Sequence, residues 1–151
     1  MPEFQLKSDS LLAAIAAHRA REEARWRREN PGKVRFYLVS APDEPPKYSA
    51  EVQSGIRSVV TALRDSQIPA DASFMTMDAV DAVGGYTGEI ALFLQSVSPV
   101  LTGILGAWLQ SRAGRKLRLK FDDIEVEANN PQEVTDMLQN VAEFRDRQEK
   151  P

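Results

Sequence analysis

The chain has 151 residues, of which 42% are hydrophobic and 27% charged, with a formal net charge of −3 and no cysteine. This length fits one domain with a substantial core, and the apolar fraction is too high for a disordered chain. The absence of cysteine excludes disulfides, iron–sulfur clusters, thiolate zinc sites and cysteine nucleophiles, and it is typical of a reducing compartment. A single histidine disfavours most histidine-based metal sites and serine–histidine–aspartate catalysis. We therefore expect a protein that binds rather than catalyses, with neither a metal nor a cofactor.

Charge is distributed unevenly along the chain. Residues 1–32 hold 6 basic and 5 acidic side chains and residues 33–111 hold 5 and 8, whereas residues 112–120 hold 5 basic and no acidic ones and residues 121–151 hold 3 and 9. Binding to a nucleic-acid backbone needs a broad basic stripe, so we do not expect a nucleic-acid partner. The first residues lack a basic region followed by an apolar stretch, and we expect a cytoplasmic protein.

The N-terminal region predicts a charged helix over residues 9–29, capped by Asp9 or Ser10. Its second half alternates arginines with glutamates at i,i+4 spacing, including Glu23 and Arg27, which is typical of a solvated helix that packs on the domain or on a second copy. We expect the chain to divide into this helix, residues 1–32, and a single α+β domain, residues 33–151.

Hydrophobic periodicity predicts the next elements of the chain. We expect a strand over residues 33–39, a helix over 49–65, a strand over 73–80 and a helix from 89 to about 112. The turn Gly84-Gly85-Tyr86-Thr87-Gly88 would then enter the last of these helices, either as a flexible connection or as a weak phosphate or nucleotide site.

A charge-free run of 22 residues, from Ile90 to Ser111, ends in Trp108 and is followed by basic residues, as membrane spans are. Polar residues and Pro99 interrupt its centre, which favours a buried core helix instead. Membrane association through residues 90–111 stays open as an alternative function.

The clearest local pattern is a β-hairpin formed by residues 116–121 and 124–128. Its register pairs apolar residues on one face and opposite charges on the other, Lys120 with Glu125 and Arg118 with Glu127. A final helix follows over residues 131–147, with Asn130 as its cap and Pro131 at its first position. We expect a small sheet, with this hairpin on one side, packed against three helices. Expected core residues are Trp108, Leu117, Leu119, Phe121, Ile124, Val126 and Leu138.

The stretch from Thr102 to Ala128, with Trp108, Leu109 and Arg112 at the helix end, followed by Asn130-Pro131-Gln132-Glu133-Val134 and Leu138, resembles the C-terminal half of the effector-associated constant component family. The resemblance covers residues 85–145. It implies a non-catalytic companion of a protease or another effector in a bacterial conflict or antiviral defence system, but it implies no reaction. The arginine-rich helix is an addition to that pattern, and Gly84-Gly85-Tyr86 departs from it.

The leading hypothesis is therefore an adaptor whose partner is an effector protein; association with a second copy stays open. Its contact surfaces would be the arginine-rich helix and the basic entry to the hairpin. The candidate partner-binding residues are Arg19, Arg21, Arg25, Arg28, Arg112 and Arg115.

Overall fold

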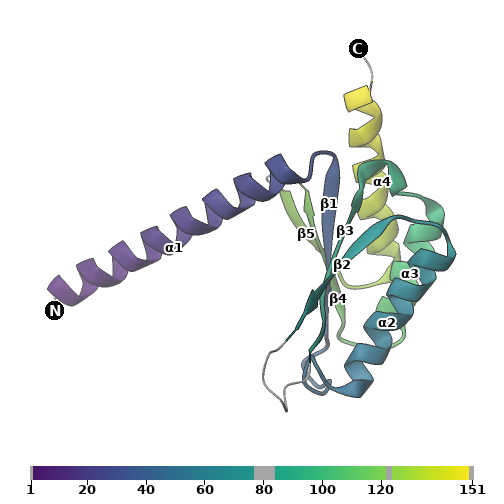
Figure 1. Ribbon diagram of the computed structural model, residues 1–151, viewed down its shortest axis with the longest axis horizontal. Coiled ribbons are helices and arrows are strands. Elements are labelled where there is room, and N and C mark those ends of the chain that lie inside the picture. Colours follow the sequence, from purple (N-terminus) through teal and green to yellow (C-terminus); the bar gives the residue numbers. More distant parts are fainter. Residues whose placement is uncertain (1, 77–83, 122–123, 150–151) are drawn as a thin grey trace. The chain divides into compact units, whose positions relative to one another are not determined.

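The computed structural model describes residues 2–76, 84–121 and 124–149. Its residues form two compact units, residues 1–32 and residues 33–151. The first unit is the helix α1, Pro2–Glu29, and the second is the α+β domain (Figure 1).

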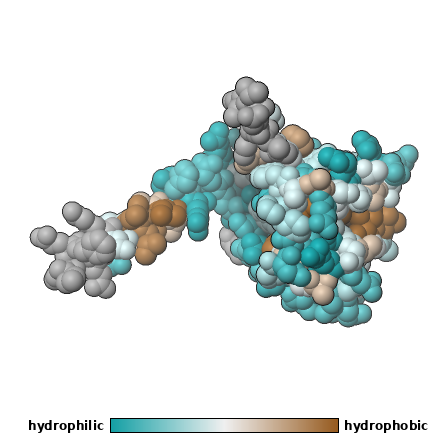
Figure 2. Space-filling view, turned by 90° about the horizontal axis from the view of Figure 1, so that it is seen from below, coloured by the Kyte–Doolittle hydropathy of each residue, from teal (hydrophilic) through white to brown (hydrophobic). Residues whose placement is uncertain are grey.

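Helix α1 is longer than the sequence pattern predicts. Asp9 and Ser10 lie within the helix, so their prediction as caps is wrong. The helix continues toward the N-terminus because residues 2–8 hold no glycine. Their one proline is the first helical residue, where its missing N–H is tolerated. Leu11 and Leu12 are 62% and 61% exposed. Figure 2 shows this apolar patch on the helix, followed by hydrophilic surface.

The domain alternates strands and helices before it closes with a hairpin and a last helix. In chain order its elements are β1 (Lys33–Val39), α2 (Ala50–Asp65), β2 (Ala70–Met75), β3 (Gly85–Phe93), the short 3₁₀ helix η1 (Leu94–Ser96), α3 (Pro99–Gln110), β4 (Lys116–Phe121), β5 (Ile124–Ala128) and α4 (Pro131–Glu149).

The five strands form one sheet in the order β2-β3-β1-β4-β5, and every neighbouring pair is antiparallel. Val34, Phe36 and Leu38 of the central strand β1 point to the same face because side chains alternate along a strand. This face packs against α2, α3 and α4, and the core lies between the sheet and these helices (Figure 1). The predicted α+β class, with a small sheet against three helices, is confirmed.

The prediction of one helix over residues 89–112 is wrong. Residues 85–93 form β3, which lies between β1 and β2, and α3 begins only at Pro99. Ser98 caps α3 by accepting a hydrogen bond from the Leu101 amide at 3.4 Å. A short apolar run fits a buried strand as well as a buried helix, and Ile90 and Leu92 are both 1% exposed in the core. Among the described residues, no helix has the length and hydropathy needed to cross a membrane.

The glycines that the sequence suggested as a helix entry lie instead at the start of β3. Gly88 has a φ of +93°, and a Cβ there would come within 2.9 Å of the Leu38 carbonyl oxygen on β1. At Gly85 a Cβ would overlap the side-chain amide of Gln53, which lies 6% exposed on α2. These positions need glycine because neighbouring elements approach the strand closely. The predicted strand over 73–80 corresponds to β2, and residues 77–80 lie outside the described part.

The hairpin and its register are confirmed. Leu117 lies opposite Ala128, Leu119 opposite Val126 and Phe121 opposite Ile124. Arg118 contacts Glu127 at 2.9 Å on the other face. The last helix is capped as predicted, because the Asn130 side chain accepts a hydrogen bond from the Glu133 amide at 2.9 Å.

Most of the expected core residues are in the core. Trp108, Leu117, Leu119 and Leu138 are at most 7% exposed, and the partly buried Phe121 ring packs edge-to-face against Phe144 at 4.7 Å. The prediction is wrong for two residues of β5, since Ile124 is 53% and Val126 37% exposed. The physical reason is the position of β5 at the edge of the sheet, where an inward-facing side chain is covered from one side less than it is on a central strand.

Candidate functional site

The arginines predicted to bind a partner differ between the two units in their exposure and in their ion pairs. In α1, the side chains of Arg19, Arg21, Arg25 and Arg28 are all exposed. Arg25 donates a hydrogen bond to Glu29 at 3.2 Å, and the predicted Glu23–Arg27 pair is present at 3.8 Å. In each pair the two residues are one helical turn apart on α1, and exposed ion pairs of this kind contribute little to stability.

Arg115 is held inside the domain instead. Its guanidinium donates to both carboxylate oxygens of Glu44, with Nη2 to Oε1 at 2.9 Å, and Nη1 donates to the Trp108 carbonyl at 2.9 Å and to the Ser111 hydroxyl at 2.7 Å. The guanidinium also lies 4.6 Å from the centre of the Trp108 ring. The side chains of Arg115 and Glu44 are only 11% and 3% exposed. Arg115 is therefore not a free cation, because Glu44 neutralises it.

The surroundings of Glu44 lower the pKa of its carboxyl group and keep it ionised. Burial by itself raises the pKa of Glu44, but the hydrogen bonds from Arg115 and from the Ala41 amide, together with the positive charges of Arg115 and Arg112, lower it more. The resulting pKa lies below the usual value for a glutamate. The ion pair therefore stays charged at neutral pH and ties the loop after β1 to the segment between α3 and β4.

Arg112 is also close to acidic groups. Its guanidinium lies 3.7 Å from the Asp43 carboxylate and 4.0 Å from that of Glu51, and it donates to the Asp43 carbonyl at 3.3 Å. Its side chain is 34% exposed. The loop over residues 41–47 thus supplies two counter-charges of the hairpin entry, Asp43 and Glu44. A clue was available in the sequence, since this acidic loop and the basic run over 112–120 carry opposite charge.

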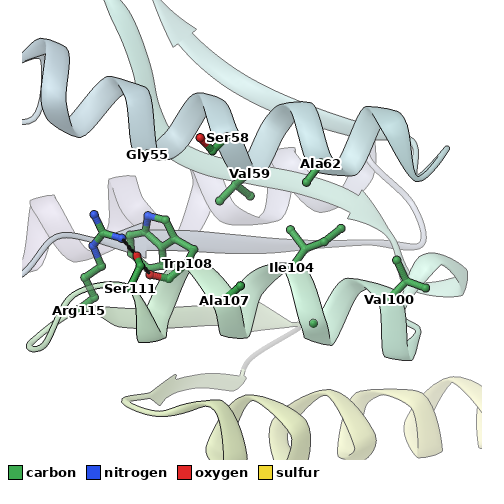
Figure 3. A pocket seen from close by; sticks show the side chains of 11 residues that line it. Gly55, Ser58, Val59, Ala62, Val100, Ile104, Ala107, Trp108, Ser111 and Arg115 are labelled. Atoms are coloured by element: carbon green, nitrogen blue, oxygen red, sulfur yellow. Dashed lines mark hydrogen bonds between the residues drawn. The ribbon is translucent and has the colours of Figure 1, made fainter.

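A groove lies between α2 and α3, and sequence reasoning missed it. Small side chains line both walls, with Gly55, Ser58 and Ala62 on α2 and Gly103 and Ala107 on α3, and the volume is about 640 Å³. Figure 3 shows Ile104 and Val59 within the groove, and the Trp108 ring beside Arg115 at one end. The volume is within the range typical of small-molecule sites, about 300–1,000 Å³.

The glycine-rich segment is built into the sheet rather than opened toward a ligand. The Tyr86 amide donates to Gln53 Oε1 at 2.8 Å, and Gln53 Nε2 donates back to the Tyr86 carbonyl at 2.9 Å. This reciprocal pair occupies the amide of Tyr86, which is therefore not available to a phosphate. In the described parts of the chain, no three metal-binding side chains of His, Asp or Glu come together.

Comparisons of the chain with protein-family models, with curated proteins and with solved structures found no match.

Proposed function

We propose that the protein is a non-enzymatic adaptor that binds a protein partner through the arginine segment of α1, residues 19–28. The observation that carries this proposal is the exposure of Arg19, Arg21, Arg25 and Arg28 on one helix. Arg112 and Arg115 are left out of this surface because acids of the domain already pair with them.

The charge of the arginine segment indicates what its partner offers. Residues 19–28 contain five arginines and two glutamates, a net charge of +3 in a chain of net charge −3. An acidic patch on a protein is the complementary surface, and guanidinium groups bind carboxylates with paired hydrogen bonds. In line with the family resemblance, the proposed partner is an effector such as a protease, in the cytoplasm of a bacterium.

Co-purification with the product of the neighbouring gene tests this proposal. We expect the wild-type protein to retain that product on an affinity column at low salt, and the double variant Arg25→Glu with Arg28→Glu to lose it, because the charge of the segment changes from +3 to about −1. The matched control is Arg57→Glu with Arg64→Glu, which reverses two exposed arginines of α2.

Equal loss of the partner in the control variant would point to the overall charge of the protein and contradict a role for α1. Failure of the wild-type protein to retain any neighbouring gene product would equally count against the adaptor function.

A further inference from the structure

Two hydrogen-bond donors lie at one end of the groove between α2 and α3. Trp108 is 7% exposed, and its indole nitrogen has no hydrogen-bond partner among the described residues. Figure 3 shows the nitrogen edge of this ring turned toward α2 at the end of the groove. The nitrogen atom itself is accessible from the groove, so a ligand that covers it has to supply an acceptor in place of water.

Arg115 contributes the second donor. An arginine has five N–H hydrogens, and the contacts with Glu44, Trp108 and Ser111 account for four of them, leaving one hydrogen of Nη2. A Cβ placed on Gly55 would lie 3.5 Å from Nη2 and 3.7 Å from Trp108 Nε1. Because Gly55 has no side chain, the surface beside both donors stays open, and the oxygen of a ligand can approach them there.

The charge around this space indicates what kind of oxygen it takes. The carboxylate of Glu44 neutralises Arg115, and the carboxylates of Asp43 and Glu51 lie within 4.0 Å of Arg112. The two arginines therefore have three carboxylates around them, and the site has no excess positive charge to hold an anionic group. A neutral carbonyl oxygen suits the two donors better than a carboxylate does.

The rest of the groove is suited to an aliphatic chain. Beyond Trp108 its walls are apolar or small, and Gly103 and Ala107 are exposed along its length together with Val100, which is 54% exposed. Gly103 has open space where its side chain would be. A chain of methylene groups would cover this surface and remove it from water, which is favourable by about 0.8 kcal/mol for each methylene buried.

We propose that this groove binds a small neutral amphiphile, an acyl amide or ester, whose carbonyl accepts from Trp108 Nε1 and Arg115 Nη2 while its chain lies between α2 and α3. This site uses no residue of α1, and the proposal does not depend on the adaptor function.

Titration with octanamide, followed through the indole N–H resonance of Trp108, tests the proposal. The resonance is assigned by its persistence in Trp26→Phe, since the chain has two tryptophans. We expect a saturable shift to lower field as the indole gains an acceptor, and weaker binding of octanoate under the same conditions. Tighter binding of octanoate, or no saturable shift with octanamide, would overturn the proposal.

Two variants locate the binding in the groove. Gly55→Ala fills the space between the donors with a methyl group at ordinary contact distance and is expected to raise the Kd for octanamide at least about tenfold, through loss of two hydrogen bonds. Gly103→Leu blocks the groove from a position with free space and is expected to abolish the binding.

The matched control is Gly106→Ala, whose methyl group would face Pro131 rather than the groove. We expect this variant to bind octanamide as the wild type does. If Gly106→Ala lost as much affinity for octanamide as Gly55→Ala, the proposed site would be contradicted. A shift of the Trp108 resonance with protein concentration alone, without octanamide, shows instead that a second copy covers the groove and overturns the proposal.

Discussion

Arg25 in α1 and Arg115 in the domain each pair with a glutamate, but the two pairs differ in nearly every other respect. The Arg25–Glu29 pair lies within one helix at 3.2 Å, with its side chains 63% and 62% exposed. The Arg115–Glu44 pair joins two distant segments at 2.9 Å, with side chains 11% and 3% exposed. Water competes with the first pair and is largely excluded from the second, so their contributions to stability differ although their chemistry is the same.

The contrast separates two uses of charge in this protein. Exposed arginines of α1 can exchange their water for a partner's carboxylates, whereas Arg115 already has its partner and helps to organise the end of the groove. The same contrast applies to leucines, because Leu11 of α1 is 62% exposed and Leu119 of β4 is 1% exposed. Three measurements test this difference between the units.

The largest effect is expected from Arg115→Ala. Removing this guanidinium leaves the buried Glu44 carboxylate without its partner, and we expect a loss of about 3–5 kcal/mol in the free energy of unfolding, measured by urea denaturation. Arg25→Ala is the control and is expected to leave the urea midpoint of the domain unchanged. Equal midpoints for the wild type and Arg115→Ala would show that the pair is not a structural element.

A smaller loss is expected from Leu119→Ala, about 2–4 kcal/mol, because the substitution opens a cavity beneath the central strands. Leu11→Ala makes the same chemical change on the exposed surface of α1, and the domain should unfold at the same urea concentration as in the wild type. A large loss of domain stability in Leu11→Ala would mean that this leucine is covered.

The smallest effect concerns pH. The pKa of Glu44 is lower in the folded than in the unfolded protein, so the unfolded state takes up the proton first as the pH falls. The stabilisation is complete above the ordinary glutamate pKa of about 4.3 and is lost as the pH falls through the lower folded value. Urea denaturation between pH 6 and pH 3 should show a steeper loss for the wild type than for Glu44→Gln. Parallel pH profiles would contradict the lowered pKa.

Local sequence patterns were sufficient to predict the structure of a segment where that structure depends only on the segment's own residues and on its neighbours in the chain. The hairpin register was predictable because a shift by one residue would oppose apolar to charged side chains at every pair. The Asn130 cap of α4 was predictable because it involves only residues three positions apart. The segment that became β3 was not predictable in this way. An apolar run carries no period that distinguishes a strand from a helix, and β1 and β2 decide its conformation by pairing with it.

The sequence by itself therefore determined the α+β class, the hairpin, the capped last helix and the arginines of α1, because these follow from alternation, spacing and side-chain chemistry. Tertiary structure decided which charges are available and where a ligand could bind. Glu44 neutralises Arg115 across 71 positions of the chain, and Gly55 meets Trp108 and Arg115 only because α2 packs beside α3. Such contacts depend on the complete fold, since residues far apart in the chain become neighbours only when the core between them has formed.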